Sequence, residues 1–129
     1  MTKEEYLFKL SLLQQEANKL EEQIQLINQQ VSELEILKMS LEKIDKIEEK
    51  EILASLGKGI FIKAEKKENE LFVNIGEGVV VKKTSKETCD IIDKQIKQLE
   101  EIKINLLSEI EKINFQLQEL VKEAREESR

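Results

Sequence analysis

An apolar heptad runs through residues 6–41 and constrains the fold of this chain more than any other feature. Position a holds Leu10, Ala17, Ile24 and Val31, and position d holds Tyr6, Leu13, Leu20, Ile27, Leu34 and Leu41. Because spacings of three and four residues alternate over about five heptads, they predict a coiled coil rather than an ordinary amphipathic helix. We therefore expect one long helix over residues 1–47.

A second heptad begins after residue 85. Position a holds Cys89, Ile96, Ile110, Leu117 and Ala124, and position d holds Ile92, Leu99, Leu106, Ile113 and Leu120. Thr84 and Glu87 have the spacing of a capping box, in which two side chains satisfy backbone N–H groups at a helix start. The 129-residue chain has no proline to break a helix from within. We expect a second helix over residues 85–129 that folds back on the first as an antiparallel coiled coil.

The middle of the chain, residues 52–83, predicts two β-hairpins. Their strands are expected at 52–56, 60–64, 71–75 and 79–83, with a polar connector at 66–70 between the hairpins. All four glycines of the chain lie in the two turns, Gly57-Lys58-Gly59 and Gly76-Glu77-Gly78. Glycine tolerates the positive φ that tight hairpin turns require. The predicted fold class is therefore α+β, mostly α, in a single subunit that spans residues 1–129.

Apolar residues on these strands indicate that the hairpins associate with other chains. Two hairpins of this size bury too little surface to be stable by themselves, and they leave open edges. Continuous apolar runs, which favour burial on both faces, occur at Ile60-Phe61-Ile62 and Val79-Val80-Val81. The strand before the second turn adds Phe72 and Val73. We predict an obligate oligomer that assembles through these eight residues.

Composition argues against several classes of function. A net charge of −6 at pH 7 disfavours nucleic acid as a partner, since phosphate binding needs basic patches. No apolar run approaches the length of about 18 residues that a membrane span needs. Without histidine or a glycine-rich phosphate loop, and without a metal-site spacing among its carboxylates, the chain is expected to have no enzymatic activity, cofactor or metal. The single cysteine, Cys89, cannot form an internal disulfide and favours the cytoplasm.

Several apolar side chains in the first turns of one helix and the last turns of the other lie outside both seams. Positions e, f and c are taken by Leu7, Phe8 and Leu12, while Phe115 lies at f and Val121 at e. A two-helix seam needs no apolar residue there, and an exposed phenylalanine lowers solubility. One hypothesis is a client-binding surface that grips unfolded chains. The alternative is scattered surface residues, which are common, or contacts with a neighbouring arm.

Other features of the helices favour structural interpretations. An apolar cluster that we expect to pack the first helix on the sheet consists of Ile36, Leu37, Met39, Ile44 and Ile47. Lys38 and Lys103 interrupt position a, where a lysine either fixes the register of the helices or extends its ammonium to solvent, the second being favoured. Cys89 is expected to be a small buried hydrophobic residue rather than a reactive thiol.

The order helix, two hairpins, helix, at this length, resembles the alpha class of prefoldin. The most specific stretch runs from residue 52 to residue 84, and its motifs are Leu53-Ala54-Ser55-Leu56-Gly57-x-Gly59, Val73-Asn74-Ile75-Gly76-x-Gly78 and Val80-Val81-Lys82-Lys83-Thr84. These are similar to the family's leucine–glycine turn, its isoleucine–glycine–x–glycine turn and its strand leading into the second helix. The family often has a proline before the leucine–glycine pair, where this chain has Ser55.

This resemblance implies a β-barrel that several subunits build from their hairpins, with coiled-coil tentacles whose tips hold unfolded proteins. It implies beta-class prefoldin subunits as partners and a group II chaperonin as the acceptor of the bound protein, without ATP or metal. Some archaeal alpha-like paralogues, such as gamma-prefoldin, assemble with themselves into filaments. We therefore expect an ATP-independent holdase subunit. The alternatives are a structural filament-forming protein that assembles through its hairpins, and an adaptor coiled coil that binds one folded partner.

Overall fold

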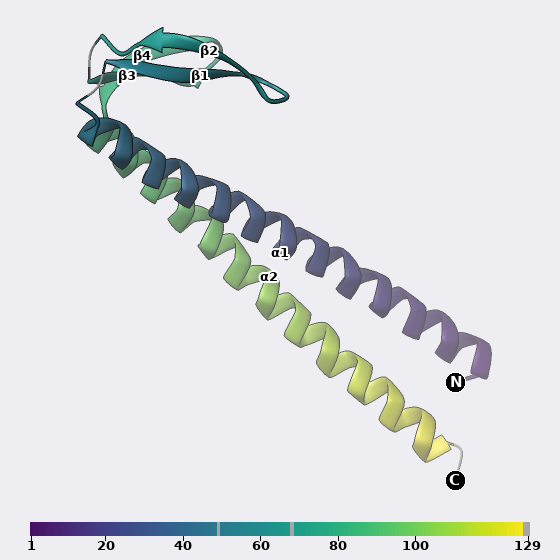
Figure 1. Ribbon diagram of the computed structural model, residues 1–129. Helices are drawn as coiled ribbons and strands as arrows, with labels where there is room; N and C mark the ends of the chain where they lie inside the picture. The colour runs from purple at the N-terminus through teal and green to yellow at the C-terminus, as the bar shows by residue number, and fades with distance from the viewer. Residues whose placement is uncertain (49, 68, 128–129) are drawn as a thin grey trace. The chain divides into compact units, whose positions relative to one another are not determined.

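The computed structural model describes residues 1–48, 50–67 and 69–127. In chain order these form α1 (Lys3–Lys46), β1 (Glu51–Gly57), β2 (Ile60–Glu65), β3 (Glu70–Gly76), β4 (Val79–Thr84) and α2 (Ser85–Glu127) (Figure 1). Both predicted helices and all four predicted strands are confirmed, and each strand ends within one residue of its predicted bounds. Of the predicted connector at 66–70, Glu70 belongs to β3, and residue 68 lies outside the described residues.

The chain divides into two compact units. The first is Met1–Ser32 with Ile96–Arg129, which joins the N-terminal part of α1 to the C-terminal part of α2. The second is Glu33–Gln95, which contains the remaining parts of both helices and the four strands. Each unit therefore has a helical seam of its own, and the hairpins belong to the second.

The heptads predict the seam of the first unit closely. Every described side chain of this unit that is not exposed occupies position a or d, with Val121 as the one exception. The most enclosed are Ile27 on α1 and Ile113 and Leu120 on α2, each 7 % exposed. The ammonium of Met1 lies 3.4 Å from a carboxylate oxygen of Glu127, so the start of α1 lies beside the end of α2 and the helices run antiparallel.

In the second unit, buried apolar residues and polar pairs join the helices. Ile92 is 4 % exposed, and burying such a side chain contributes about 1.5–3 kcal/mol to folding. Lys38 Nζ lies 2.8 Å from Asp93 Oδ1, and the Ser85 hydroxyl donates a hydrogen bond of 2.8 Å to Asp45. As α1 advances from Lys38 to Asp45, its partner on α2 moves back from Asp93 to Ser85, so the helices are antiparallel here as well.

Both helices begin with a capping box. At α2, Thr84 Oγ1 accepts a hydrogen bond of 3.1 Å from the Glu87 backbone N–H, while a Glu87 carboxylate oxygen accepts one of 3.2 Å from the Thr84 N–H. The backbone bond, together with a second bond from the Thr84 hydroxyl, holds the pKa of Glu87 below its ordinary value. At α1, Thr2 and Glu5 form the same reciprocal pair. The box at α2 is confirmed, and that at α1 has the same spacing but was not predicted.

Each hairpin closes through a two-residue turn. β1 pairs antiparallel with β2, and β3 pairs antiparallel with β4. The turn residues Lys58 and Gly59 have φ of 51° and 79°, and Glu77 and Gly78 have φ of 51° and 76°. Positive φ at both central residues is the conformation of a type I′ turn, whose twist matches that of the flanking strands. The predicted role of glycine in these turns is therefore confirmed.

The capping box of α2 yields the first testable prediction. Replacing Thr84 with alanine removes the acceptor for the Glu87 N–H and one donor to the Glu87 carboxylate. We expect the free energy of unfolding at pH 7 to fall by about 1 kcal/mol. Denaturant unfolding, followed by circular dichroism at one fixed protein concentration, measures this change. Ser108→Ala, at an exposed position inside α2, is the control and should cause no such loss.

The same variant should show a smaller loss in acid. Because the folded state lowers the pKa of Glu87, its carboxylate adds stability above the ordinary glutamate pKa of about 4.3, and this stability disappears as the pH falls through the folded-state pKa. Without the Thr84 hydroxyl that pKa is lowered less, so less stability remains to be lost in acid. A difference between wild type and Thr84→Ala that is as large at pH 3 as at pH 7 would contradict this account of the cap.

Candidate functional site

Titratable groups with shifted pKa values have structural explanations in this protein. Burial, followed by the nearby Glu42 carboxylate, raises the pKa of the Cys89 thiol, which therefore stays protonated as a small, partly buried side chain. The hydrogen bond to Asp93 raises the pKa of Lys38. Over the described ranges 1–48, 50–67 and 69–127, no group of three metal-binding side chains gathers, and no helix is long and apolar enough to cross a membrane. The candidate functional sites described below are surfaces.

The cross-helix pair of Lys38 corrects one prediction. We favoured an ammonium extended into solvent, but the structure places it 2.8 Å from Asp93 on the opposite helix. A polar residue at position a that finds its partner in one register favours that register over others. Lys66 connects the segment after β2 to the end of α1, since its ammonium donates a hydrogen bond of 2.6 Å to the Ile44 carbonyl. At the other interrupted a position, Lys103 is half-buried.

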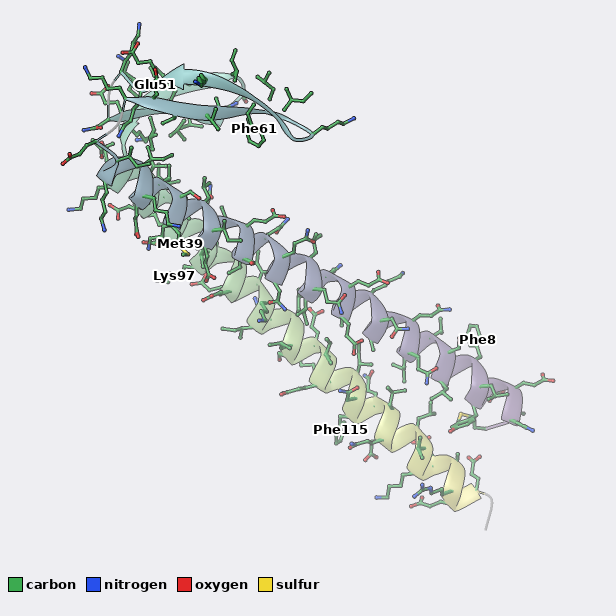
Figure 2. All side chains as sticks on the ribbon, in the orientation of Figure 1. Phe8, Met39, Glu51, Phe61, Lys97 and Phe115 are labelled. Atoms are coloured by element: carbon green, nitrogen blue, oxygen red, sulfur yellow. The ribbon has the colours of Figure 1, made fainter. Side chains whose placement is uncertain are left out.

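Four of the five client-binding candidates are exposed. Leu7 and Leu12 are about half exposed, and Phe8 and Phe115 are 65 % and 63 % exposed. Phe8 and Phe115 point in different directions from their helices (Figure 2). Val121 is half-buried beside the seam. These residues therefore lie on more than one side of the helix pair.

A groove in the first unit brings two of the candidates together. Leu12 of α1 and Phe115 of α2 both line it, and its volume is about 430 Å³. The seam residues Leu13 and Leu120 add to its apolar lining. Charged and polar side chains also line it, namely Lys9, Glu16, Gln116, Glu119 and Glu123. An open apolar groove with charged residues around it suits weak binding of extended, partly apolar chain segments.

Further apolar side chains on the helices are exposed but were not predicted as binding residues. They lie in the first unit at positions c, g, b and e of the heptads, and they are Leu26, Ile102, Ile104 and Leu107. Ile104 is 65 % exposed, as much as Phe8. Their exposure could have been predicted from the sequence, since each is apolar and lies outside the a and d positions. They lie away from the first turns of α1 and the last turns of α2, where the client-binding residues were predicted.

On the hairpins, most of the predicted assembly residues are exposed in the single chain. At least half of each side chain is exposed for Ile60, Phe61, Ile62, Phe72, Val79 and Val80. Val73 and Val81 are half-buried. The same surface includes three exposed residues that were not predicted as assembly residues, Leu53, Leu56 and Ile75.

The strand register explains this division between the two faces of each hairpin. Ile52 lies opposite Ala64, and Val73 lies opposite Val81; these pairs share the half-buried faces. One residue further along each strand, the side chains point to the other face. That face carries Leu53 and Phe61 on the first hairpin and Phe72 and Val80 on the second, and these residues are 55–67 % exposed. Each hairpin thus has one face that is half-buried at residues such as Ile52 and Val73, although Ile62 and Val79 on these faces are at least half exposed. The opposite face, called the bare apolar face below, carries apolar residues that are all more than half exposed.

The apolar cluster at the end of α1 only partly covers the sheet, which corrects another prediction. Ile44 is half-buried and lines a hollow together with Ile52 and Leu71 of the hairpins, as expected for packing on the sheet. The remaining members of the cluster are 41–61 % exposed, and they are Ile36, Leu37, Met39 and Ile47. The first three of these lie at f, g and b of the heptad, outside the stripe that the helix buries.

Comparisons with known proteins agree with this architecture. A family model described as "Prefoldin: Prefoldin subunit" matches residues 13–129. Among solved structures, the chain is similar to the filamentous PFD from Methanocaldococcus jannaschii, determined by cryo-EM, with a TM-score of 0.80 and 16 % sequence identity. That likeness covers 88 % of this chain and 96 % of the other, and at this identity it shows the fold. No curated protein gives a significant match.

The bare hairpin face yields a second prediction. Replacing the exposed Val80 with aspartate should release monomers or small species, because an unpaired carboxylate cannot be buried against another chain without a large desolvation penalty. The solution mass by light scattering measures this effect. Ile104→Asp, at an exposed position on α2, is the matched control and should leave the mass unchanged. An unchanged mass for Val80→Asp would show that the hairpins do not build the assembly.

Proposed function

The chain belongs to the prefoldin family, and on that premise we propose that it is a subunit of an ATP-independent holdase. In this proposal, non-native polypeptides bind to five off-seam apolar residues of the first unit, Leu7, Phe8, Leu12, Phe115 and Val121. The hairpins join subunits into an oligomer with an intersubunit β-barrel. The bound client is then passed to a group II chaperonin. The prefoldin family consists of non-enzymatic chaperones, which supports a role without catalysis.

The observation that carries the proposal is the exposure of large apolar side chains at positions that the seam does not use. Phe8 and Phe115 are each more than 60 % exposed, and Leu12 shares a groove with Phe115. Exposed side chains of this size cost solubility, and a function is the simplest reason to keep them. A non-native chain presents apolar segments without a fixed shape, and a shallow, open surface accepts such segments without demanding one geometry.

Weak contacts of this kind need several copies to hold a client. A single small groove buries too little surface for tight binding, since association costs translational and rotational freedom. Joining subunits raises the effective concentration of the remaining grooves once one has bound, and the combined affinity can exceed that of one site by orders of magnitude. The hairpins and the grooves therefore depend on each other in this mechanism. Assembly through the hairpins supplies the copies that the grooves require.

Membership of the prefoldin family supports a proposal for the partners and the compartment of this protein. We propose that beta-class prefoldin subunits complete the oligomer, and that the protein acts in the cytoplasm, as its lone and partly buried Cys89 also favours.

The second candidate function is a structural filament built through the hairpins. The similarity in fold to a filamentous PFD favours it, because that protein assembles into filaments. In this case the helices would space or decorate the filament, and removing the exposed apolar residues of the helices would leave its assembly unaffected. Electron microscopy of the purified chain, in the absence of any beta-class subunit, distinguishes long filaments from small oligomers.

The holdase proposal yields a third prediction. Replacing Leu7, Phe8, Leu12 and Phe115 together with serine should abolish most of the protection against aggregation, because the apolar contacts with the client are lost. Light scattering from chemically denatured citrate synthase, diluted into buffer with and without the protein, measures protection. The helical content should stay unchanged, since all four residues are exposed.

The matched control tests whether binding is confined to these residues. It carries serine at four other exposed positions outside the seam of the same unit, namely Leu26, Ile102, Ile104 and Leu107. Protection should survive in the control. If the first variant still prevents aggregation as well as wild type does, the client-binding role of those four residues fails. If neither variant nor wild type gives protection, the holdase proposal itself fails.

A further inference from the structure

The two hairpins are copies of one module. A shift of 19 residues converts the register of β1 and β2 into that of β3 and β4, so that Gly57↔Ile60 becomes Gly76↔Val79. Both ladders have a bulge directly before the turn, between Ser55 and Gly57 in the first and between Asn74 and Gly76 in the second. The strands have the same lengths in both hairpins.

The turns repeat in detail as well. The first turn residue is Lys58 in one hairpin and Glu77 in the other, and each has φ of 51°. Before each turn, a side-chain oxygen accepts a hydrogen bond from a glycine N–H: Ser55 Oγ from Gly57 at 3.2 Å, and Asn74 Oδ1 from Gly76 at 2.9 Å. The backbones of the two hairpins therefore present nearly equivalent docking surfaces.

The bare apolar faces also correspond. Leu53 and Phe61 on the first hairpin match Phe72 and Val80 on the second, and all four are more than half exposed. Each hairpin therefore has an exposed apolar face, and the two faces are similar in shape. On this basis, each hairpin could pack against a copy of itself or against the other hairpin. Shape and hydrophobicity by themselves do not decide which hairpin pairs with which.

Charge is what distinguishes the modules. The turn of the first hairpin carries Lys58, and the turn of the second carries Glu77. The strand ends away from the turns have the reverse balance. On the first hairpin they carry Glu51, Lys63 and Glu65, and on the second Glu70, Lys82 and Lys83. Counted over the strand residues alone, the first hairpin is positive at its turn and net negative at its strand ends, and the second hairpin is the opposite. Lys50 and Lys66, which lie just outside β1 and β2, are not part of this count.

We propose that the first hairpin of one copy of this chain docks beside the second hairpin of another copy, with both turns at the same end, so that Lys58 faces Glu77. This inference rests on the proposed assembly through the hairpins and names the partner surface. Such a contact forms when β1 of one copy lies antiparallel to β4 of the next, because β1 ends at its turn and β4 begins at its turn. Away from the turns, Glu51 of β1 then lies toward the end of β4 that carries Lys82 and Lys83.

The contact has a consequence for the form of the assembly. Each copy carries one hairpin of each kind, so every copy can use its first hairpin toward one neighbour and its second toward another. A contact between unlike surfaces is heterologous, and it repeats to give a ring if the rotation closes or an open filament if it does not. The charge pattern thus favours an assembly in which all copies are joined head to tail, first hairpin to second hairpin.

Charge exchange at the turns tests the proposal. Lys58→Glu and Glu77→Lys should each raise the protein concentration needed for assembly by about threefold to tenfold, because each places like charges at the contact. The double variant, which exchanges the two residues, should restore assembly to near the wild-type level. Since both positions have the same φ, the exchange makes no new demand on the backbone. Sedimentation velocity over a range of concentrations measures assembly, and Lys97→Glu on an exposed face of α2 controls for net charge.

Each other outcome overturns the inference. A contact between like hairpins with turns at opposite ends would put Lys58 beside Glu51 and Glu65 of the neighbour, and the double variant would then assemble no better than the single ones. The inference would also be refuted if the single variants assembled like wild type, or if Lys97→Glu weakened assembly as much as Lys58→Glu does. Neither result would contradict assembly through the hairpins. Wild-type protein that stays monomeric at every concentration would refute the inference and the proposed assembly together.

Discussion

Each hairpin of this protein is a two-stranded sheet, and such a sheet has two open edges and too little surface to cover its own apolar side chains. The half-buried faces carry residues such as Ile52 and Val73, whereas the opposite faces expose more than half of Phe61 and Phe72. Lys82, whose ammonium lies 5.6 Å from the centre of the Phe72 ring, offers only partial cover. The need for other chains arises from this uncovered surface. An oligomer is therefore expected to be a condition for stable hairpins and, in the proposed function, also a condition for holding a client, because it joins several grooves.

The helices satisfy a different constraint, because their apolar seam is narrow. Positions a and d bury side chains such as Ile27 and Ile113, and the remaining positions are free to vary without loss of the fold. Exposed apolar residues at those positions are thus compatible with a stable coiled coil, so the proposed binding surface and the core are formed by different residues. Polar contacts in the second unit add specificity that the apolar stripe lacks. The Lys38–Asp93 ion pair and the Asp45–Ser85 hydrogen bond are each satisfied in one antiparallel register.

Much of this structure could be predicted from the sequence, because its strongest signals are local. The heptads identified the seam residues, and the glycines identified both turns, although Gly57 and Gly76 proved to be the last residues of β1 and β3. Long-range pairs were out of reach: Asp93 as the partner of Lys38, and the Ile44 carbonyl as the partner of Lys66, depend on how two distant segments are aligned. Packing of Ile36 and Met39 on the sheet was wrongly expected, since a small sheet covers only the part of α1 that carries Ile44. The exposure of Ile104 could have been predicted, because an apolar residue outside positions a and d of the heptad lies away from the seam.

The central claim is that contact with other chains stabilises the hairpins, and amide hydrogen exchange tests it most directly. Exchange of the backbone amides at 51–65 and 70–84 would be measured at protein concentrations above and below that of assembly, with the a and d positions of α1 and α2 as the internal reference. The account predicts strand amides that are protected in the assembled protein and exchange rapidly on dilution, while the helical seams keep most of their protection. Strand amides that stay equally protected in the monomer would contradict it, because the hairpins would then be stable without a partner.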